Sequence, residues 1–225
     1  MNGSWIRADW PAPRNVIAGT TLRSTDFDSL GIPGEPCWLN QVHGAAVVDA
    51  AQAGERPDAD ASLTADARHI CVVRTADCLP VLICSNDGRE AAAAHAGWRG
   101  LAAGILEATV ARMAHDAGDL MVWLGPAISQ PAFEVGGEVR TAFVDQDAAA
   151  NTCFVPNERG RWQADLYGLA RQRLEAMGIR AVSGGGFCTF REKERFFSYR
   201  RNPDCGRMVS FVALEALEKA GPDAI

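Results

Sequence analysis

Two histidines and one cysteine in this sequence have the residue types and surroundings from which a reactive or metal-binding site can be built. His43 stands in WLNQVHG, where an apolar stretch ends at a glycine, and His95 stands in AAAAHAGWRG, at the end of a small-residue run. Between them, Cys78 lies in TADCLP, a tight connection between two apolar runs. A Cys–His pair can act as a nucleophile and its base. Two imidazoles and a thiolate can instead hold Zn²⁺ and leave a fourth position open to water. The spacings of 35 and 17 residues do not decide between these two chemistries.

The apolar pattern predicts the strands and helices that must position these side chains. Continuous apolar runs, typical of strands covered on both faces, are found at 70–74, 79–84, 90–95, 120–124 and 208–214. Apolar residues at helical spacing predict helices over 98–115, 136–144 and 165–177. We therefore expect an α/β (α+β) fold with mixed β-sheets and outer helices. The three candidate residues fall at strand ends, which is where such folds place their chemistry.

The length and composition predict one globular domain over residues 1–225. A chain with 48% hydrophobic and 22% charged residues is typical of globular proteins, which excludes a disordered, collagen-like or coiled-coil chain. The polar segment 51–66 is too short to separate two cores. Because no apolar run approaches the ~20 residues of a membrane span, we expect no membrane partner.

The charge and the cysteine content narrow the class of partner and the cellular compartment. The formal net charge is −6, which disfavours a nucleic-acid-binding surface. Seven cysteines, an odd number at scattered positions, argue against a disulfide framework. The start of the chain also lacks the basic and apolar regions of a secretory signal. These features predict a cytoplasmic protein with reduced thiols. The oligomeric state does not follow from the sequence.

Six segments in one order resemble the YfiH family, also known as polyphenol-oxidase or laccase-domain proteins and peptidoglycan editing factors. These segments are WLNQVHG, DADASLTAD, TADCLPVLIC, AAAAHAGWRGLAAGILEATV, WLGPAISQPAFEVG and CTF…ERFFSYRR…GRMVS. The resemblance covers the chain from about Gly19 onward. It implies that His43, Cys78 and His95 are the metal ligands and the catalytic residues. Zn²⁺ is the implied metal, with Cu as the alternative ion.

The same resemblance implies an activity. It is zinc-dependent phosphorolysis of purine nucleosides, including adenosine, inosine and S-methyl-5′-thioadenosine, together with adenosine deamination. The implied partners are therefore a small-molecule purine nucleoside and phosphate. One region departs from the family pattern, because the chain is abbreviated before about residue 36. There, Thr20, Thr21 and Arg23 match a family turn whose glycine pair is absent.

Residues near the family motifs are candidates for binding substrate and for supporting the metal. Arginine binds phosphate through two parallel N–H groups. The arginines that we expect to contact substrate or phosphate are Arg23, Arg99, Arg200 and Arg201. Polar residues that flank metal ligands often orient them, and the flanking residues here are Gln41 and Asp77.

Three other functions stay open at this stage. Two histidines and a cysteine also resemble a blue-copper ligand set, which would suit a copper-dependent, laccase-like polyphenol oxidase. The four histidines of the chain are, however, too few for a multicopper cluster. A cysteine hydrolase could use Cys78 and His95 without a metal. A cell-wall precursor editing factor would need little nucleoside turnover of its own.

Overall fold

The computed structural model describes residues 5–216, and its centre is a pair of β-sheets packed face to face. One sheet has five strands in the order β1 (Trp5–Arg7), β2 (Val16–Thr21), β14 (Met208–Leu214), β6 (His69–Thr75) and β3 (Glu35–Cys37). The other sheet has six strands in the order β13 (Ala181–Gly184), β9 (Leu120–Leu124), β7 (Leu79–Ser85), β8 (Ala91–Ala96), β5 (Ala61–Thr64) and β4 (Val47–Asp49). Both sheets mix parallel and antiparallel neighbours, which confirms the predicted fold class.

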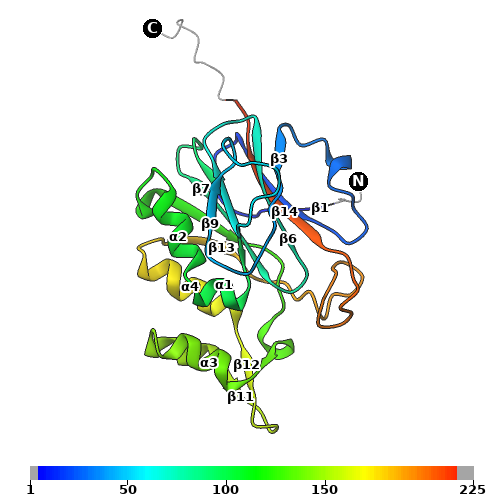
Figure 1. Cartoon of the computed structure of the whole chain (residues 1–225), viewed down its shortest axis with the longest axis vertical. Helices are drawn as coiled ribbons and strands as arrows, with labels where there is room; N and C mark the ends of the chain where they lie inside the picture. Colours follow the sequence, from blue (N-terminus) through cyan, green and yellow to red (C-terminus); the bar gives the residue numbers. More distant parts are fainter. Residues whose placement is uncertain (1–4, 217–225) are drawn as a thin grey trace, which may run out of the picture.

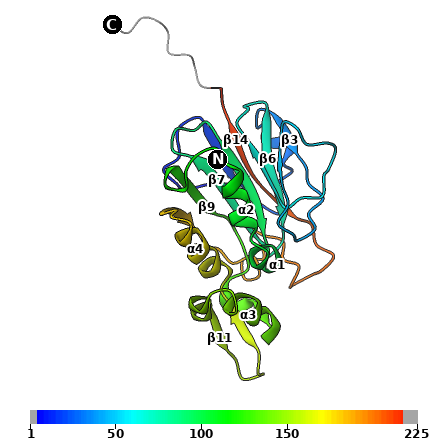
Figure 2. The ribbon, with the colours of Figure 1, turned by 60° about the vertical axis from the view of Figure 1, so that its left-hand side comes forward.

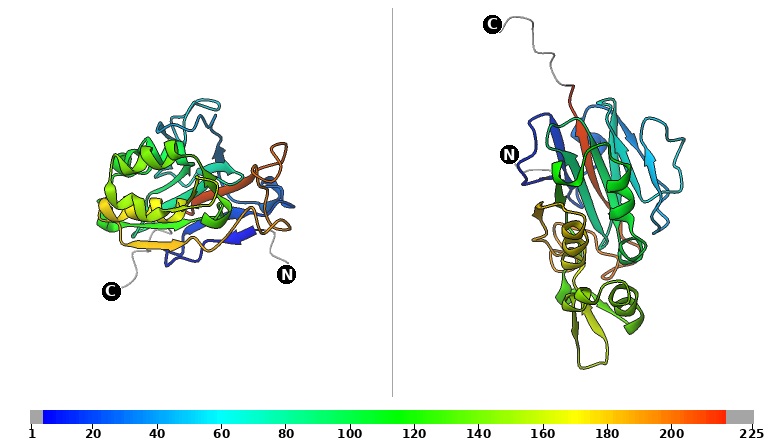
Figure 3. Two further views of the ribbon diagram at one scale, coloured as in Figure 1. Left: turned by 90° about the horizontal axis from the view of Figure 1, so that it is seen from below. Right: turned by 90° about the vertical axis from the view of Figure 1, so that its left-hand side faces the viewer.

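Helices cover the outer face of the six-stranded sheet (Figure 1, Figure 2). They are α1 (Trp98–Ala102), α2 (Ile105–Arg112) and α4 (Leu166–Ala176). The helices α2 and α4 pack against each other, and seen from below the helices lie together on one side of the strands (Figure 3). A lobe at one end of the molecule holds α3 (Gly137–Val144) and a small sheet of β10 (Glu134–Val135), β12 (Trp162–Ala164) and β11 (Phe154–Pro156). Short 3₁₀ helices occupy Asp28–Leu30, Ala117–Asp119, Gln130–Ala132 and Ala148–Cys153.

The strand β8 is the most enclosed element of the core. All six of its residues are buried, and five of them are alanines. One face of the strand packs against the helices, while the other faces the five-stranded sheet. Because small side chains let neighbouring layers approach closely, the run of alanines suits a strand between two covered faces. His95 is the one polar side chain that this strand carries, so a rigid and buried element fixes its position.

The predicted strands are confirmed, but the predicted helix over 98–115 is wrong. The chain breaks this helix into α1 and α2 at Gly104, where φ is +86°. A residue in the left-handed region interrupts α-helical geometry, and glycine adopts it with the least strain. The other two helices form as predicted, within one residue at each end.

Among the described helices, none has both the length and the apolar character required to cross a bilayer. The single-domain organisation and the abbreviated region before about residue 36 stay predictions.

Candidate metal centre

The pairing of two neighbouring strands brings Cys78 and His95 to the same edge of the six-stranded sheet. In the antiparallel register of β7 and β8, Pro80 lies opposite His95. Cys78, two residues before Pro80, therefore lies beside Gly97, two residues after His95. A Cβ atom at Gly97 would stand 2.8 Å from the sulfur of Cys78 and 3.3 Å from Nδ1 of His43. The glycine of the HAGWRG motif thus leaves the space in which the three side chains meet.

The buried carboxylate of Asp60 fixes the loop that carries His43 and pairs with the ring of His95. One oxygen accepts a hydrogen bond from the backbone N–H of His43 at 3.0 Å, and the other accepts from Val42 at 3.2 Å and Gly44 at 2.7 Å. These bonds fix a loop in which His43 has a φ of +60°. The same carboxylate pairs with Nδ1 of His95 at 2.8 Å. Because Asp60 occupies Nδ1, Nε2 is the nitrogen of His95 that remains free to bind a metal.

Hydrogen bonds within this group shift the pKa values of its members in opposite directions. Burial alone would raise the pKa of the Cys78 thiol, but hydrogen bonds with His43 and His95 outweigh it and lower the pKa to about 6. Burial would lower the pKa of His95, yet its bonds with Asp60 and Cys78 raise it to about 9. Burial opposes ionisation of Asp60 as well, but the bond from His95 and those from the loop N–H groups keep the pKa below its usual value. Cys78 is therefore available as a thiolate, the form that binds metals.

The three side chains fit a metal ion in both chemistry and position. One donor atom each from His43, Cys78 and His95 lies within 4.8 Å of the others, and no other such group of three occurs among residues 5–216. The two imidazole rings meet edge to face, with centroids 4.8 Å apart. His95 is buried, Cys78 is half-buried and His43 is exposed, so the group opens toward solvent on one side. Two nitrogens and a thiolate with an open side suit Zn²⁺ and copper alike.

The triad lies in the wall of a cavity of about 810 Å³. This volume falls in the range of small-molecule sites. Besides the triad, the residues that characterise the wall are four arginines and three aromatic side chains, namely Arg74, Arg99, Arg200, Arg207, Trp98, Phe133 and Tyr199. The only carboxylate among the described lining residues is that of Asp77.

Two of the four arginines expected at the site, Arg99 and Arg200, line this cavity, whereas the other two do not. The guanidinium group of Arg201 donates hydrogen bonds to the backbone carbonyls of Thr189, Phe190 and Phe196. The guanidinium group of Arg23 donates to the carbonyl of Lys193 and lies 5.3 Å from the ring of Phe197. Both arginines therefore stabilise the loop 185–207 between β13 and β14, here called the C-terminal loop.

The two residues expected to orient the metal ligands line the cavity, but their hydrogen bonds go elsewhere. Gln41 pairs with the backbone of Arg74, donating to its carbonyl at 2.9 Å and accepting from its N–H at 2.8 Å. Asp77 accepts hydrogen bonds from Thr189 Oγ1 at 2.6 Å, Ser198 Oγ at 3.0 Å and the N–H of Arg200 at 2.7 Å. Gln41 therefore ties the His43 loop to β6, and Asp77 ties the C-terminal loop to the cavity wall.

Sequence reasoning missed Asp60 as the residue that orients a ligand, and Arg74 and Arg207 as lining residues. Asp60 lies in the polar segment 51–66, whose composition is typical of an exposed loop, so its burial could not be predicted from the residues around it. Arg74 ends an apolar run at the point where a strand meets the TADC motif. A charged residue at such a strand end faces either solvent or a site, and the sequence alone does not distinguish them.

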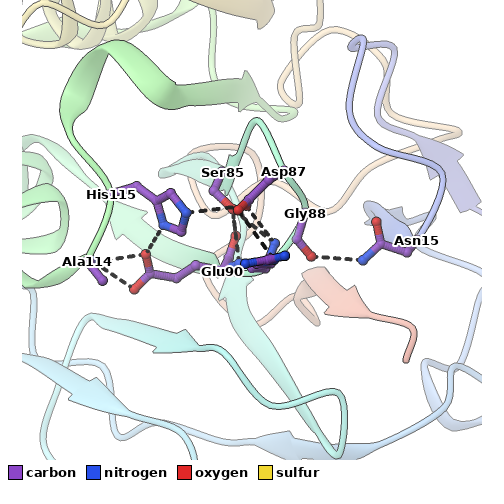
Figure 4. Close-up of polar contacts among 8 residues, drawn as sticks. Asn15, Ser85, Asp87, Gly88, Glu90, Ala114 and His115 are labelled. Carbon is purple, nitrogen blue, oxygen red and sulfur yellow. Dashed lines mark hydrogen bonds and ion pairs between the residues drawn. The ribbon is translucent and has the colours of Figure 1, made fainter. Parts of the chain in front are cut away.

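The other two histidines lie outside the triad. His115 belongs to a cluster at the opposite end of β8, where Glu90 accepts hydrogen bonds from its Nδ1 at 2.9 Å and from the N–H of Ala114 (Figure 4). Asp87 lies 3.3 Å from the second ring nitrogen of His115. His69 begins β6 and is half-buried.

Comparisons with known proteins agree with this fold and show the family to which the chain belongs. A family model described as multi-copper polyphenol oxidoreductase laccase matches residues 18–215. A purine nucleoside phosphorylase of Pseudomonas aeruginosa is 48% identical, over 94% of this chain and 99% of the relative. The purine nucleoside phosphorylase YfiH of Escherichia coli is 50% identical, over 93% of this chain and 98% of the relative. The crystal structure of a Neisseria meningitidis protein of DUF152 has a TM-score of 0.91 and 41% identity, covering 95% of this chain and 100% of that protein.

The chain therefore belongs to the YfiH family, which confirms the resemblance carried by the six sequence segments. Its mixed α/β architecture is that of the family's solved structures.

Proposed function

We propose that the protein is a zinc-dependent purine nucleoside phosphorylase. The observation that carries the proposal is a His–Cys–His group in the wall of a cavity that also presents arginines with no acidic partner among the described residues. Relatives at 48% and 50% identity that are named purine nucleoside phosphorylases support it. The proposed substrates are adenosine, inosine and S-methyl-5′-thioadenosine. Since all seven cysteines are free thiols, the proposed compartment is the cytoplasm.

The proposed reaction exchanges one bond at the ribose for another. An oxygen of inorganic phosphate forms a bond to C1′ while the bond between C1′ and N9 of the purine breaks. The purine leaves with the electron pair and takes up a proton, so the products are the free base and ribose 1-phosphate. Negative charge arrives with phosphate and develops on the leaving base. The site must therefore bind an anion and stabilise a second one as it forms.

Arg99 and Arg200 are the groups that we propose bind the attacking phosphate. The guanidinium of Arg99 lies 4.6 Å from the ring centroid of Trp98. That of Arg200 lies 5.6 Å from the ring of Phe133 and donates one hydrogen bond to the carbonyl of Glu134. Stacking restricts each planar group, while several N–H donors stay available for phosphate oxygens. The backbone N–H of Arg200 is bonded to Asp77, which fixes the start of this side chain.

The triad residues are proposed to hold the metal on the wall of the cavity. When bound, zinc supplies a Lewis acid that withdraws electron density from a ligand atom of the substrate. Asp60 keeps the proton of His95 on Nδ1 and so keeps Nε2 free. The exposed position of His43 leaves the triad accessible from the cavity. This access is also the reason to extend the proposal to adenosine deamination, in which water replaces the 6-amino group and ammonia leaves.

A copper-dependent polyphenol oxidase is the second candidate, because the matching family model is described as a laccase. Multicopper oxygen reduction requires several copper ions with many imidazole ligands. Residues 5–216 contain all four histidines of the chain but only one group of three metal-binding side chains. We therefore favour the phosphorylase, with copper as a competing ion at the same triad.

The test is product analysis on protein of known metal content. Inosine is incubated with the purified protein with and without phosphate, and we expect hypoxanthine and ribose 1-phosphate only when phosphate is present. Cys78→Ala should lose zinc and turnover together, because it removes one of three protein ligands. Cys205→Ala is the matched control: this cysteine lines the same cavity outside the triad, so the variant should keep its zinc. Phenol oxidation without any nucleoside cleavage would refute the proposal.

A further inference from the structure

The cavity holds more positive charge than phosphorolysis of a nucleoside requires. Four arginines line it, and none of them forms an ion pair with another described residue. The single lining carboxylate, Asp77, is already bonded to two hydroxyl groups and a backbone N–H. One phosphate dianion would offset two of the four charges. Arg99 and Arg200 have that role in the proposed function, so Arg74 and Arg207 are left without an anionic partner.

The strand register places Arg74 and Arg207 next to each other. In the antiparallel pair of β6 and β14, Val209 lies opposite Arg74. Arg207 stands two residues before Val209, directly ahead of the start of β14, and it lines the same cavity as Arg74. Diagonal neighbours in paired strands have Cα atoms ~7–8 Å apart, and side chains as long as arginine can reach across such a separation at the end of the pair. Repulsion from Arg207 is one cause that lowers the pKa of Arg74, after burial and repulsion from Arg56, which agrees with their proximity.

Hydrogen bonds restrict the positions of Arg74 and Arg207. Gln41 bonds to the backbone of Arg74 on both sides, at 2.9 and 2.8 Å, while the guanidinium of Arg74 has no hydrogen bond among the described residues. The guanidinium of Arg207 bonds to the carbonyls of Cys205 and Gly206. Its carbon atom lies 5.8 Å from the ring centroid of Tyr199. Arg74 is half-buried and Arg207 is exposed, so the two like charges repel each other at the cavity wall and an anion bound between them would relieve the repulsion.

The two pairs of arginines come from different layers of the fold. Arg99 belongs to α1 on the outer face of the six-stranded sheet, and Arg200 stacks on the ring that precedes β10. Arg74 belongs to β6 of the five-stranded sheet, and Arg207 directly precedes β14 of the same sheet. Two anion sites that share one cavity fit a reaction in which the attacking phosphate and the substrate each carry a phosphoryl group.

We propose that Arg74 and Arg207 form a second anion subsite that binds a phosphoryl group of the substrate, which extends the substrate class to purine nucleoside 5′-monophosphates. The inference rests on the proposed function. The bonds exchanged are unchanged: phosphate attacks C1′, the purine leaves with the electron pair and is protonated, and the products are the base and ribose 1,5-bisphosphate. Inorganic phosphate carries the same anionic group and is the alternative ligand of Arg74 and Arg207.

The experiment compares equilibrium binding of three ligands by titration calorimetry with zinc-loaded protein. The ligands are inosine 5′-monophosphate, inosine and inorganic phosphate, each titrated alone so that no phosphorolysis occurs. The variants are Arg74→Gln and Arg207→Gln, and Arg207→Lys retains the charge but not the two parallel donors. The matched control is Arg7→Gln, because Arg7 ends a strand of the same sheet and stacks on Trp5 but does not line the cavity.

We expect wild-type protein and Arg7→Gln to bind the monophosphate more tightly than inosine. Each Gln variant should lose ~10- to 100-fold in affinity for the monophosphate, the range for one charge-assisted hydrogen bond, with unchanged affinity for inosine. Arg207→Lys should lose less. Equal binding of the monophosphate and inosine by wild-type protein would overturn the proposal. The proposal would also be overturned if the Gln variants lost affinity for inorganic phosphate but kept their affinity for the monophosphate. The arginine pair would then bind the attacking phosphate. A wild-type protein that cleaves no nucleoside would contradict the proposed function instead, since the binding comparison needs no turnover.

Discussion

Replacing Asp60 with asparagine is the sharpest test of how this site is held together. The carboxylate accepts four hydrogen bonds, from Nδ1 of His95 and from the backbone N–H groups of Val42, His43 and Gly44. An amide has one accepting oxygen, and its NH₂ group would face donors. At least two donors therefore lose their acceptor, and each hydrogen bond to a charged group contributes about 1.5–3 kcal/mol. Since the position is fully buried, we expect the free energy of unfolding of the metal-free protein to fall by roughly 3–5 kcal/mol.

The same change should weaken zinc binding. An NH₂ group facing Nδ1 of His95 favours the tautomer with its proton on Nε2, the nitrogen that must bind the metal. Loss of such a carboxylate partner typically costs ~10- to 100-fold in metal affinity. Chelator competition measures the affinity, and urea unfolding of the metal-free protein measures the stability. The control is Asp58→Asn, because Asp58 is exposed and bonds to Asn40 alone among described side chains. A folded Asp60→Asn protein that binds zinc as tightly as Asp58→Asn would refute the role assigned to this carboxylate.

Three further changes have defined outcomes. Gly97→Ala should weaken zinc binding ~10-fold or more in the chelator assay, because its Cβ would stand 2.8 Å from the sulfur of the triad. Gly104→Ala should lower the free energy of unfolding by about 1–2 kcal/mol, because φ is +86° there. The control for both variants is Gly118→Ala, which should change neither the zinc affinity nor the free energy of unfolding, because a Cβ atom there would meet no atom within 4 Å. His115→Gln should destabilise the protein by roughly 0.5–1 kcal/mol near pH 6 and less at pH 9. The bond to a buried glutamate raises the pKa of His115, so its contribution is complete below pH ~6.5 and is lost as the pH rises through the raised value. Urea unfolding of the wild-type and variant proteins at the two pH values measures this difference.

The sequence was sufficient for five of the strands, namely β6, β7, β8, β9 and β14, and for the three metal-ligand candidates, but for different reasons. The short strands were not predicted. Continuous apolar runs identify covered strands because both faces need apolar side chains, and β7 has all seven of its residues buried. The position of Gly104 shows the limit of periodicity. Apolar residues on both sides of it keep helical spacing, yet the backbone at this one residue ends α1 and begins α2. The triad was selected by residue type and family motif, while its geometry depends on a strand register that spacing does not encode.

The supporting residues were harder to predict, because hydrogen bonds between distant segments decide them. Asp77 stands next to a ligand in the sequence, yet its carboxylate bonds to residues more than a hundred positions away. Asp60 is seventeen and thirty-five positions from the two histidines that it holds. Arg201 lies in the same motif as its neighbour Arg200, but its guanidinium group donates hydrogen bonds to three backbone carbonyls. Adjacency in the chain therefore does not tell which polar group supports a site.

The shared carboxylate of Asp60 makes the proposed metal site preorganised. In a zinc finger, the ion itself gathers its ligands and its binding energy is the folding energy. Here the central strands position Cys78 and His95, and hydrogen bonds to the Asp60 carboxylate fix the loop that carries His43. The entropy of collecting three ligands is thus lost during folding, before any ion arrives. We expect metal uptake to leave the circular dichroism spectrum and the radius of gyration nearly unchanged, and a chelated sample to regain full zinc occupancy without refolding.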